Sequence, residues 1–159
     1  MNYKHTQIGW LMLISFGLLV TLCAVVPLSE PGQRELILCT ALIVTALVLI
    51  LVGTLTVEVD IIKVRLRFGI GLIRKGFLLE DIESCRTVKN KWWWGWGIKW
   101  MPNGWLFNVS GLDAVELKMK DGRYYRIGTD DPKRLAETIR LLLGGNALSR
   151  TQTFADEFD

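Results

Sequence analysis

The chain has 159 residues, half of them hydrophobic, with 19 basic and 16 acidic side chains and a net charge of +3. This length allows one modest domain with attachments. The three cysteines, Cys23, Cys39 and Cys85, are odd in number and form no pattern, which predicts reduced, structural thiols. A pairing of Cys23 with Cys39 is the alternative, and nothing in the sequence requires it.

Two long segments near the N-terminus contain no charged side chain. Residues 8–28 (21 residues) and 36–53 (18 residues) can each cross a bilayer core of about 30 Å as a helix. The segment between them, SEPGQRE, holds a Pro-Gly pair and three charges, which predicts a turn outside the hydrocarbon. A signal peptide is the competing interpretation of the first segment, but its apolar core is too long and a second span follows at once. The sequence therefore predicts a transmembrane α-hairpin within residues 1–53.

Basic residues predict the orientation of this hairpin. The connecting turn has Arg34 alone, whereas the flank after the second span is strongly basic, with Lys63, Arg65, Arg67, Arg74 and Lys75. Positive charge collects on the cytoplasmic side of membrane proteins. We expect a multi-pass protein of the bacterial inner (cytoplasmic) membrane, with both termini and the following domain in the cytoplasm.

From residue 54 the hydrophobic pattern alternates with period two, as in half-buried antiparallel strands. Leu55, Val57 and Val59 share one face of the first predicted strand. In the second, KVRLRF, the inward residues are Val64, Leu66 and Phe68. A turn at residues 61–62 would bring Asp60 near Lys63 and Glu58 near Arg65 as cross-strand ion pairs.

The later strands are separated by clear turn signals. Residues 81–89 form a strand of uncertain register, and the Pro-Asn-Gly at 102–104 predicts a hairpin between GIKWM and WLFNVS. AVELKMK and RYYRIG follow. A three-residue loop between them, with Gly122 in the left-handed region, would align Tyr125 and Ile127 with the apolar face.

One amphipathic helix closes the domain, which we place at residues 54–143. Asp131 is a good N-cap and Pro132 suits the first helical position. The apolar stripe consists of Leu135, Ile139, Leu142 and Leu143. Gly144 and Gly145 are expected to end the helix, and residues 144–159 to form a flexible tail.

About seven strands followed by a helix resemble a pleckstrin-homology (PH) fold. The order of VSG, AVEL, DGR and IGTDDP resembles the bacterial PH-like domains that follow transmembrane segments in small membrane proteins. The resemblance covers roughly residues 53–143. It implies two nearly orthogonal antiparallel sheets in a partly open barrel, capped by the C-terminal helix. The expected fold class is thus an N-terminal transmembrane α-hairpin plus a PH-like domain.

Two groups of residues are candidates for binding. The first is the tryptophan-rich stretch 89–105, which holds six of the seven tryptophans. Alternate residues of the strand at 97–101, together with Trp105, are expected to fill the barrel. At least one ring of the consecutive tryptophans 92–94 is expected to point outward beside cations, as in interfacial anchors and binding hot spots. The predicted binding residues of this group are Lys89, Lys91, Trp92, Trp93 and Trp94.

The second group is the basic run Lys63, Arg65 and Arg67, with Arg74 and Lys75. The PH resemblance implies contact with lipid head groups there, and a solvated face paired with Glu58 and Asp60 is the simpler interpretation. The domain has 16 basic and 11 acidic residues, a net +5, which suits an anionic bilayer surface. A membrane tether disfavours nucleic acid as a partner.

Catalysis has little support in the sequence. The only histidine, His5, precedes the first span, where we expect a flanking interfacial role, and no cluster has metal-ligand spacing. We expect no catalytic residue, metal or cofactor. The predicted function is a non-catalytic, membrane-anchored scaffold or adaptor that recognises a protein or anionic lipid, with self-association a further option. The alternative is a membrane-bound enzyme or enzyme subunit whose site forms only in a complex.

Overall fold

The structure, a computed structural model, describes residues 3–25 and 31–156. Within these ranges the strands are β1 (Tyr3–Ile8), β2 (Thr54–Val59), β3 (Lys63–Phe68), β4 (Ile73–Leu78), β5 (Ile82–Lys89), β6 (Gly97–Met101), β7 (Gly104–Asn108), β8 (Asp113–Met119) and β9 (Tyr124–Gly128). The helices are α1 (Trp10–Val25), α2 (Pro31–Val52) and α3 (Pro132–Asp156), and short 3-10 turns are η1 (Leu79–Asp81) and η2 (Trp92–Trp94).

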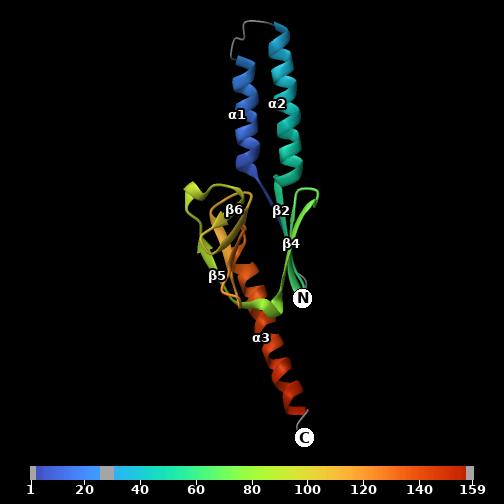
Figure 1. The fold of residues 1–159 in the computed structure, drawn as a ribbon, viewed down its shortest axis with the longest axis vertical. Helices are drawn as coiled ribbons and strands as arrows, with labels where there is room; N and C mark the ends of the chain where they lie inside the picture. Colours follow the sequence, from blue (N-terminus) through green and yellow to red (C-terminus); the bar gives the residue numbers. More distant parts are fainter. Residues whose placement is uncertain (1–2, 26–30, 157–159) are drawn as a thin grey trace.

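The strands form two sheets, and the helices leave the domain at opposite ends (Figure 1). Sheet A has the order β1-β2-β3-β4, and sheet B has the order β5-β8-β9-β7-β6. Two sheets with a C-terminal helix were predicted, and this is confirmed. The expected count of about seven strands omitted β1 and β4, and one pair, β7 with β9, is parallel rather than antiparallel.

A single core fills the space between the sheets. The predicted inward residues of β2 and β3 are all buried, from Leu55 to Phe68. Sheet B contributes Phe107, Leu117 and Ile127 to the same cluster. Helix α3 closes the core against β5 and β8 through Leu135 and Ile139, as its apolar stripe predicted.

The predicted turns set the register. Glu58 lies opposite Arg65, as expected. Between β8 and β9, the N–H of Met119 donates to the carbonyl of Arg123 at 2.9 Å, and Gly122 has a φ of 82°. This is the three-residue loop, and it pairs Leu117 with Tyr125. The predicted hairpin of β6 and β7 is also present.

Strand β1 was not predicted, and it joins the N-terminus to the domain. It pairs along its whole length with β2, from Tyr3 opposite Val59 to Ile8 opposite Thr54. The α1–α2 pair is therefore inserted between two neighbouring strands. The predicted division of the chain at residues 53 and 54 assigned these first residues to the membrane segment, and it must be corrected for β1.

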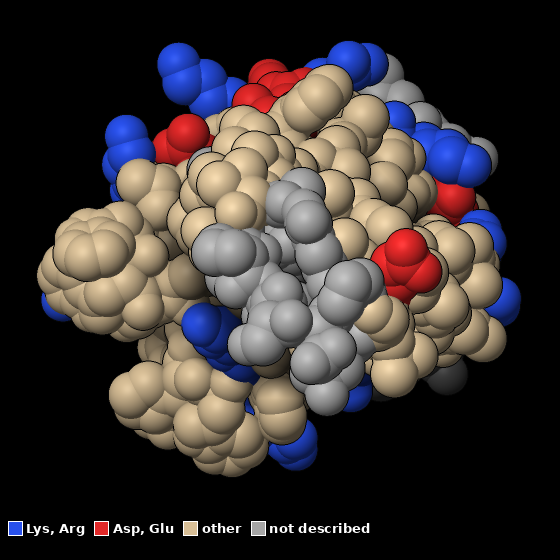
Figure 2. Space-filling view, turned by 90° about the horizontal axis from the view of Figure 1, so that it is seen from above, with Lys and Arg blue, Asp and Glu red and all other residues tan. Residues whose placement is uncertain are grey.

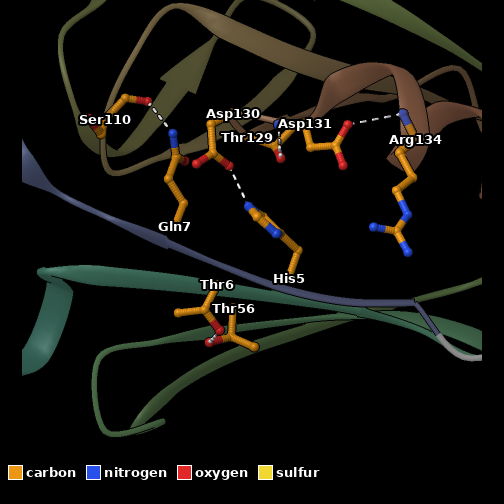
Figure 3. A network of polar contacts seen from close by, with 9 residues as sticks. All are labelled: His5, Thr6, Gln7, Thr56, Ser110, Thr129, Asp130, Asp131 and Arg134. Carbon is orange, nitrogen blue, oxygen red and sulfur yellow. Dashed lines mark hydrogen bonds and ion pairs between the residues drawn. The ribbon is translucent and has the colours of Figure 1, made fainter.

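Side chains of β1 also contact the segments that follow β7 and β9 (Figure 3). His5 contacts Asp130 just before α3, and Gln7 donates to the carbonyl of Ser110 at 2.9 Å. His5 thus has a partner within the domain, and its expected role beside a membrane span stays a prediction. The inward residues of β1 are Tyr3 and Gln7 with half-buried His5, and this polar set lacks the apolar alternation that identifies a strand.

Helices α1 and α2 lie side by side and project from the domain (Figure 1). In the described residues, one stretch is long and apolar enough to cross a membrane, Glu35–Val52 in α2, with a mean hydropathy of 2.8. Helix α1 contains a shorter apolar stretch, Met12–Leu22. Residues 26–28, the end of the first predicted span, and residues 29–30, the start of the predicted turn, lie outside the described residues. The rest of the predicted turn is helical, because α2 already begins at Pro31, and proline suits the first helical position.

Helix α3 begins as predicted and ends later. The side chain of Asp131 accepts a hydrogen bond from the N–H of Arg134 at 3.4 Å, which confirms the N-cap. The helix then continues through Gly144 and Gly145 to Asp156, so the predicted helix end is wrong. A helical glycine costs about 1 kcal/mol relative to alanine, and no proline follows that would force an end.

Candidate functional site

The predicted basic residues of β3 and β4 come together on sheet A. A hollow of about 290 Å³ is lined by Lys63, Arg65, Arg67, Arg74 and Lys75 with one carboxylate, that of Glu58. We call this the basic hollow. Gly76 lies opposite Arg65 in the register, so the missing side chain leaves room between the cations.

Ion pairing neutralises only part of the basic hollow. Arg65 pairs with Asp60 at 3.4 Å, whereas Glu58 pairs with Lys4 of β1 at 3.1 Å. The predicted partner of Glu58 is therefore replaced by a residue of the strand that the sequence did not reveal. Arg67 and Arg74 lie directly opposite each other and form no ion pair within the described part of the chain. Like charges in that position repel, so an anion would be stabilised between them.

The tryptophan run forms the 3-10 turn η2 rather than a strand. The rings of Trp92 and Trp93 are 72% and 60% exposed and meet edge to face, with centroids 6.0 Å apart. The ammonium of Lys91 lies 5.1 Å from the centroid of Trp93. The prediction that at least one ring points outward is confirmed. Lys89 is exposed at the end of β5, just before this turn.

Trp105 does not fill the barrel, contrary to expectation, and β6 lacks the expected alternation of buried residues, so that Trp100 also lies outside the core. Both are exposed, and their rings pack edge to face with centroids 5.3 Å apart. The register places them on the same side of sheet B as Tyr125, a core residue. Because β6 is the edge strand of this sheet, Trp100 has no neighbouring strand on its outer side and its ring faces solvent.

A third surface, on sheet B, was missed by sequence reasoning. Arg86, Glu116 and Arg126 come from β5, β8 and β9 and lie directly opposite one another. Glu116 accepts hydrogen bonds from the Nε of Arg86 at 2.7 Å and the Nε of Arg126 at 2.6 Å. We call these three residues the Arg–Glu–Arg row.

Turn η2 covers one end of this row, at Arg126. The guanidinium of Arg126 lies 4.8 Å from the centroid of Trp94, so the third tryptophan of η2 packs inward onto sheet B. Beside it is a cleft of about 340 Å³, lined by Trp94, Tyr124 and the Arg–Glu–Arg row together with Met101, Pro102 and Asn103. A smaller hollow of about 230 Å³ shares Trp94 and reaches Lys99.

Glu116 stays ionised in spite of its burial. Its side chain is only 5% exposed, and burial, the largest single effect, opposes ionisation. The hydrogen bonds from Arg126 and Arg86, and the charges of both, together outweigh burial and hold the pKa of Glu116 below its ordinary value. The row is thus a closed ionic network.

The remaining chemical groups have structural roles. Burial raises the pKa of the Cys85 thiol, and the nearby charge of Arg140 lowers it by less; the thiol donates to the carbonyl of Ala136 at 3.5 Å. The hydroxyl of Thr129 accepts a hydrogen bond from the N–H of Asp131 at 3.1 Å, beside the His5–Asp130 contact (Figure 3). In the described residues, no group of three potential metal ligands is present.

Comparison with known proteins adds no identification. No family model matches this chain, and a search of the curated proteins finds no match. The resemblance to PH-like domains therefore stays a prediction.

Proposed function

We propose that this chain is a non-catalytic recognition module of the PH-like type, anchored in the cytoplasmic membrane by α1 and α2 as a two-span hairpin. The domain lies on the cytoplasmic side and binds anionic lipid head groups in the basic hollow. The single observation that carries the proposal is the insertion of the helix pair between β1 and β2.

The insertion leaves no linker between helices and domain. Ile8 and Thr54 are paired in the sheet, and the N–H of Gly9 donates to the carbonyl of Gly53 at 2.8 Å. Because both helices leave adjacent strands at once, the domain cannot move away from a bilayer that the helices cross. The strong basic flank after the second helix supports a cytoplasmic location.

The basic hollow suits a lipid surface in charge and position. Arg67 and Arg74 precede and follow the loop that leads toward the end of α2, and their charges are not neutralised by carboxylates in the described residues. A cation near an anionic leaflet contributes about 1 kcal/mol of attraction. Head groups would also relieve the repulsion between the two facing guanidinium groups.

The test uses the full chain, because a fragment of residues 54–143 would lack β1. We would purify the protein in detergent and measure binding of phosphatidylglycerol by native mass spectrometry, comparing the wild type with R67Q/R74Q. Loss of two cations should weaken binding by about 2 kcal/mol, roughly 30-fold. The matched control, K120Q/K133Q, removes two exposed cations elsewhere. Equal binding by both variants would exclude the basic hollow as the lipid site.

A second candidate function, a protein adaptor, is favoured by the cleft on sheet B. Arg86 is held by Glu116 at one edge of its guanidinium, yet its side chain is 68% exposed. Together with Trp94 and Tyr124 it offers an aromatic and cationic site for an acidic segment of a partner protein. A photo-crosslinker placed at Asn103 in native membranes tests this function. A crosslinked protein that is lost on Arg86→Ala would support it, and a crosslink only to a second copy of this chain would indicate self-association instead.

A further inference from the structure

Two short segments from different sheets lie at the end of the domain from which α1 and α2 project. One is the loop of residues 69–72, between β3 and β4, and the other is η2, between β5 and β6. Figure 1 shows them on opposite sides of the helix pair, near its lower end. Neither belongs to the core, and their side chains Ile70, Leu72, Trp92 and Trp93 are exposed.

The first segment is fastened to the last turn of α2. The N–H of Ile70 donates to the carbonyl of Ile50 at 3.2 Å, and that of Gly69 donates to the carbonyl of Thr54 at 2.9 Å. Gly69 has a φ of 48°, and a Cβ there would lie 1.9 Å from the carbonyl oxygen of Ile50. Only glycine permits so close an approach, so the contact between loop and helix is built into the fold.

This contact fixes the depth of the loop. The apolar stretch of α2 extends to Val52, two residues beyond Ile50. At 1.5 Å per residue, the contact lies about 3 Å inside the end of that stretch. The loop nevertheless carries two large apolar side chains, Ile70 and Leu72, that are 63% and 71% exposed.

Two arginine side chains contact the same loop next to these apolar side chains. The Nε of Arg74 donates to the carbonyl of Gly71, and the guanidinium of Arg67 lies against Gly71 on the same loop. An apolar tip with a cationic base suits the boundary between acyl chains and anionic head groups.

The second segment repeats this arrangement with aromatic side chains. Trp92 and Trp93 are exposed, and Lys91 lies over the ring of Trp93. Figure 2 shows the molecule from the end at which the helices project. At the left, the side on which η2 lies in Figure 1, mostly uncharged surface projects outward, with basic side chains beside it. Indole rings favour the depth of the lipid head groups.

We propose that residues 69–72 and the aromatic turn Trp92–Trp93 are two membrane-inserted feet that seat the domain on the bilayer on either side of the helix pair. The occupant of both surfaces is the interfacial region of the lipid bilayer. This inference rests on the proposed crossing of the membrane by α2. The helix pair joins the domain without a linker, so contact of both feet with the bilayer would fix the tilt of the domain. It would also hold Arg67 and Arg74 at the depth of the lipid head groups.

The experiment measures accessibility of single introduced cysteines to a water-soluble maleimide in native membrane vesicles. The foot variants are Ile70→Cys and Trp92→Cys. The matched control is Ile61→Cys, in the turn at the other end of sheet A, where the native side chain is 58% exposed and thus comparable with Ile70 in the domain alone. The wild type, with its own three cysteines, supplies the background.

Both foot variants should react about tenfold more slowly than Ile61→Cys, because the lipid excludes the water-soluble maleimide and a thiol in apolar surroundings forms less of the reactive thiolate. Equal reaction at positions 70 and 61 would overturn the seating of the loop, and equal reaction at 92 and 61 that of the aromatic turn. Alkaline extraction of the same vesicles distinguishes this from failure of the anchor. Recovery of the protein in the pellet would support the proposed membrane crossing even if the feet fail the labelling test. Release into the supernatant would contradict the membrane crossing itself.

Discussion

The outer faces of the two sheets each carry a row of charged residues, and the two rows differ in how far their charges are paired. On sheet B, Glu116 is buried between Arg86 and Arg126, and both arginines share its carboxylate. On sheet A, Arg67 faces Arg74 without a carboxylate in the described residues. The same strand geometry thus gives a closed network on one face and an open cationic site on the other. The difference teaches that the charge left unpaired, rather than the number of basic residues, marks the face suited to an anionic ligand.

Glu116→Gln should have the largest effect on stability. It leaves the largely buried Arg126 without its counter-charge, which costs about 3 kcal/mol of unfolding free energy. Glu58→Gln, on sheet A, removes a surface pair with Lys4 and should cost at most about 1 kcal/mol. Thermal unfolding followed by tryptophan fluorescence in detergent compares the two. Similar shifts in Tm would contradict the distinction between the faces.

Acid should weaken the closed network. The pKa of Glu116 in the folded protein lies below its ordinary value of 4.5. The resulting stability is therefore fully present above the ordinary pKa and is lost as pH falls through the lowered one. The contribution of Glu116 to the unfolding free energy should stay constant from pH 7 to about 5 and decline below about 4. In Glu116→Gln this part of the decline should vanish, and an unchanged acid profile would assign the decline to other groups.

Trp94→Leu sharpens the comparison within η2 itself. Trp94 lies over Arg126, whereas Trp92 projects outward. Loss of the ring over the arginine should cost about 1 kcal/mol of unfolding free energy, and Trp92→Leu should leave stability in detergent within about 0.5 kcal/mol of the wild type. Denaturant titration in detergent micelles measures both. A larger loss for Trp92→Leu would show that its ring supports the fold.

The double variant R67Q/R74Q should have the smallest effect on stability. The variant removes the repulsion between the two arginines and the hydrogen bond from Arg74 to the carbonyl of Gly71, and no ion pair in the described residues. These two effects oppose each other, so the unfolding free energy should change by no more than about 0.5 kcal/mol. Its effect on lipid binding is then separable from any effect on folding. A substantial loss of stability would mean that these arginines support the domain itself.

Much of the fold could be predicted because its signals are local. Alternation identified β2 and β3, and Gly122 determined the loop that aligns Tyr125 with the core. The basic hollow was also predictable in its residues, since Arg67 and Arg74 flank a single turn.

What escaped prediction depends on contacts between distant segments. The inward residues of β1, Tyr3, His5 and Gln7, give no apolar pattern, and the strand precedes a long apolar segment that dominates its surroundings. The Arg–Glu–Arg row joins three strands that are separated by up to 40 positions, and only the register makes them neighbours. The outward alternation of Arg86, Glu116 and Arg126 was the available signal, but it could not show that β5 and β9 both pair with β8.

The central claim is that α1 and α2 form a two-span hairpin that holds the domain on the cytoplasmic side. Its most direct test labels Ser29→Cys, between the helices, and Ile61→Cys, in the domain, with a membrane-impermeant maleimide in intact bacterial spheroplasts and in inverted vesicles. The account predicts that position 29 reacts in spheroplasts and position 61 in inverted vesicles. Reaction of both positions from the same side of the membrane would contradict it.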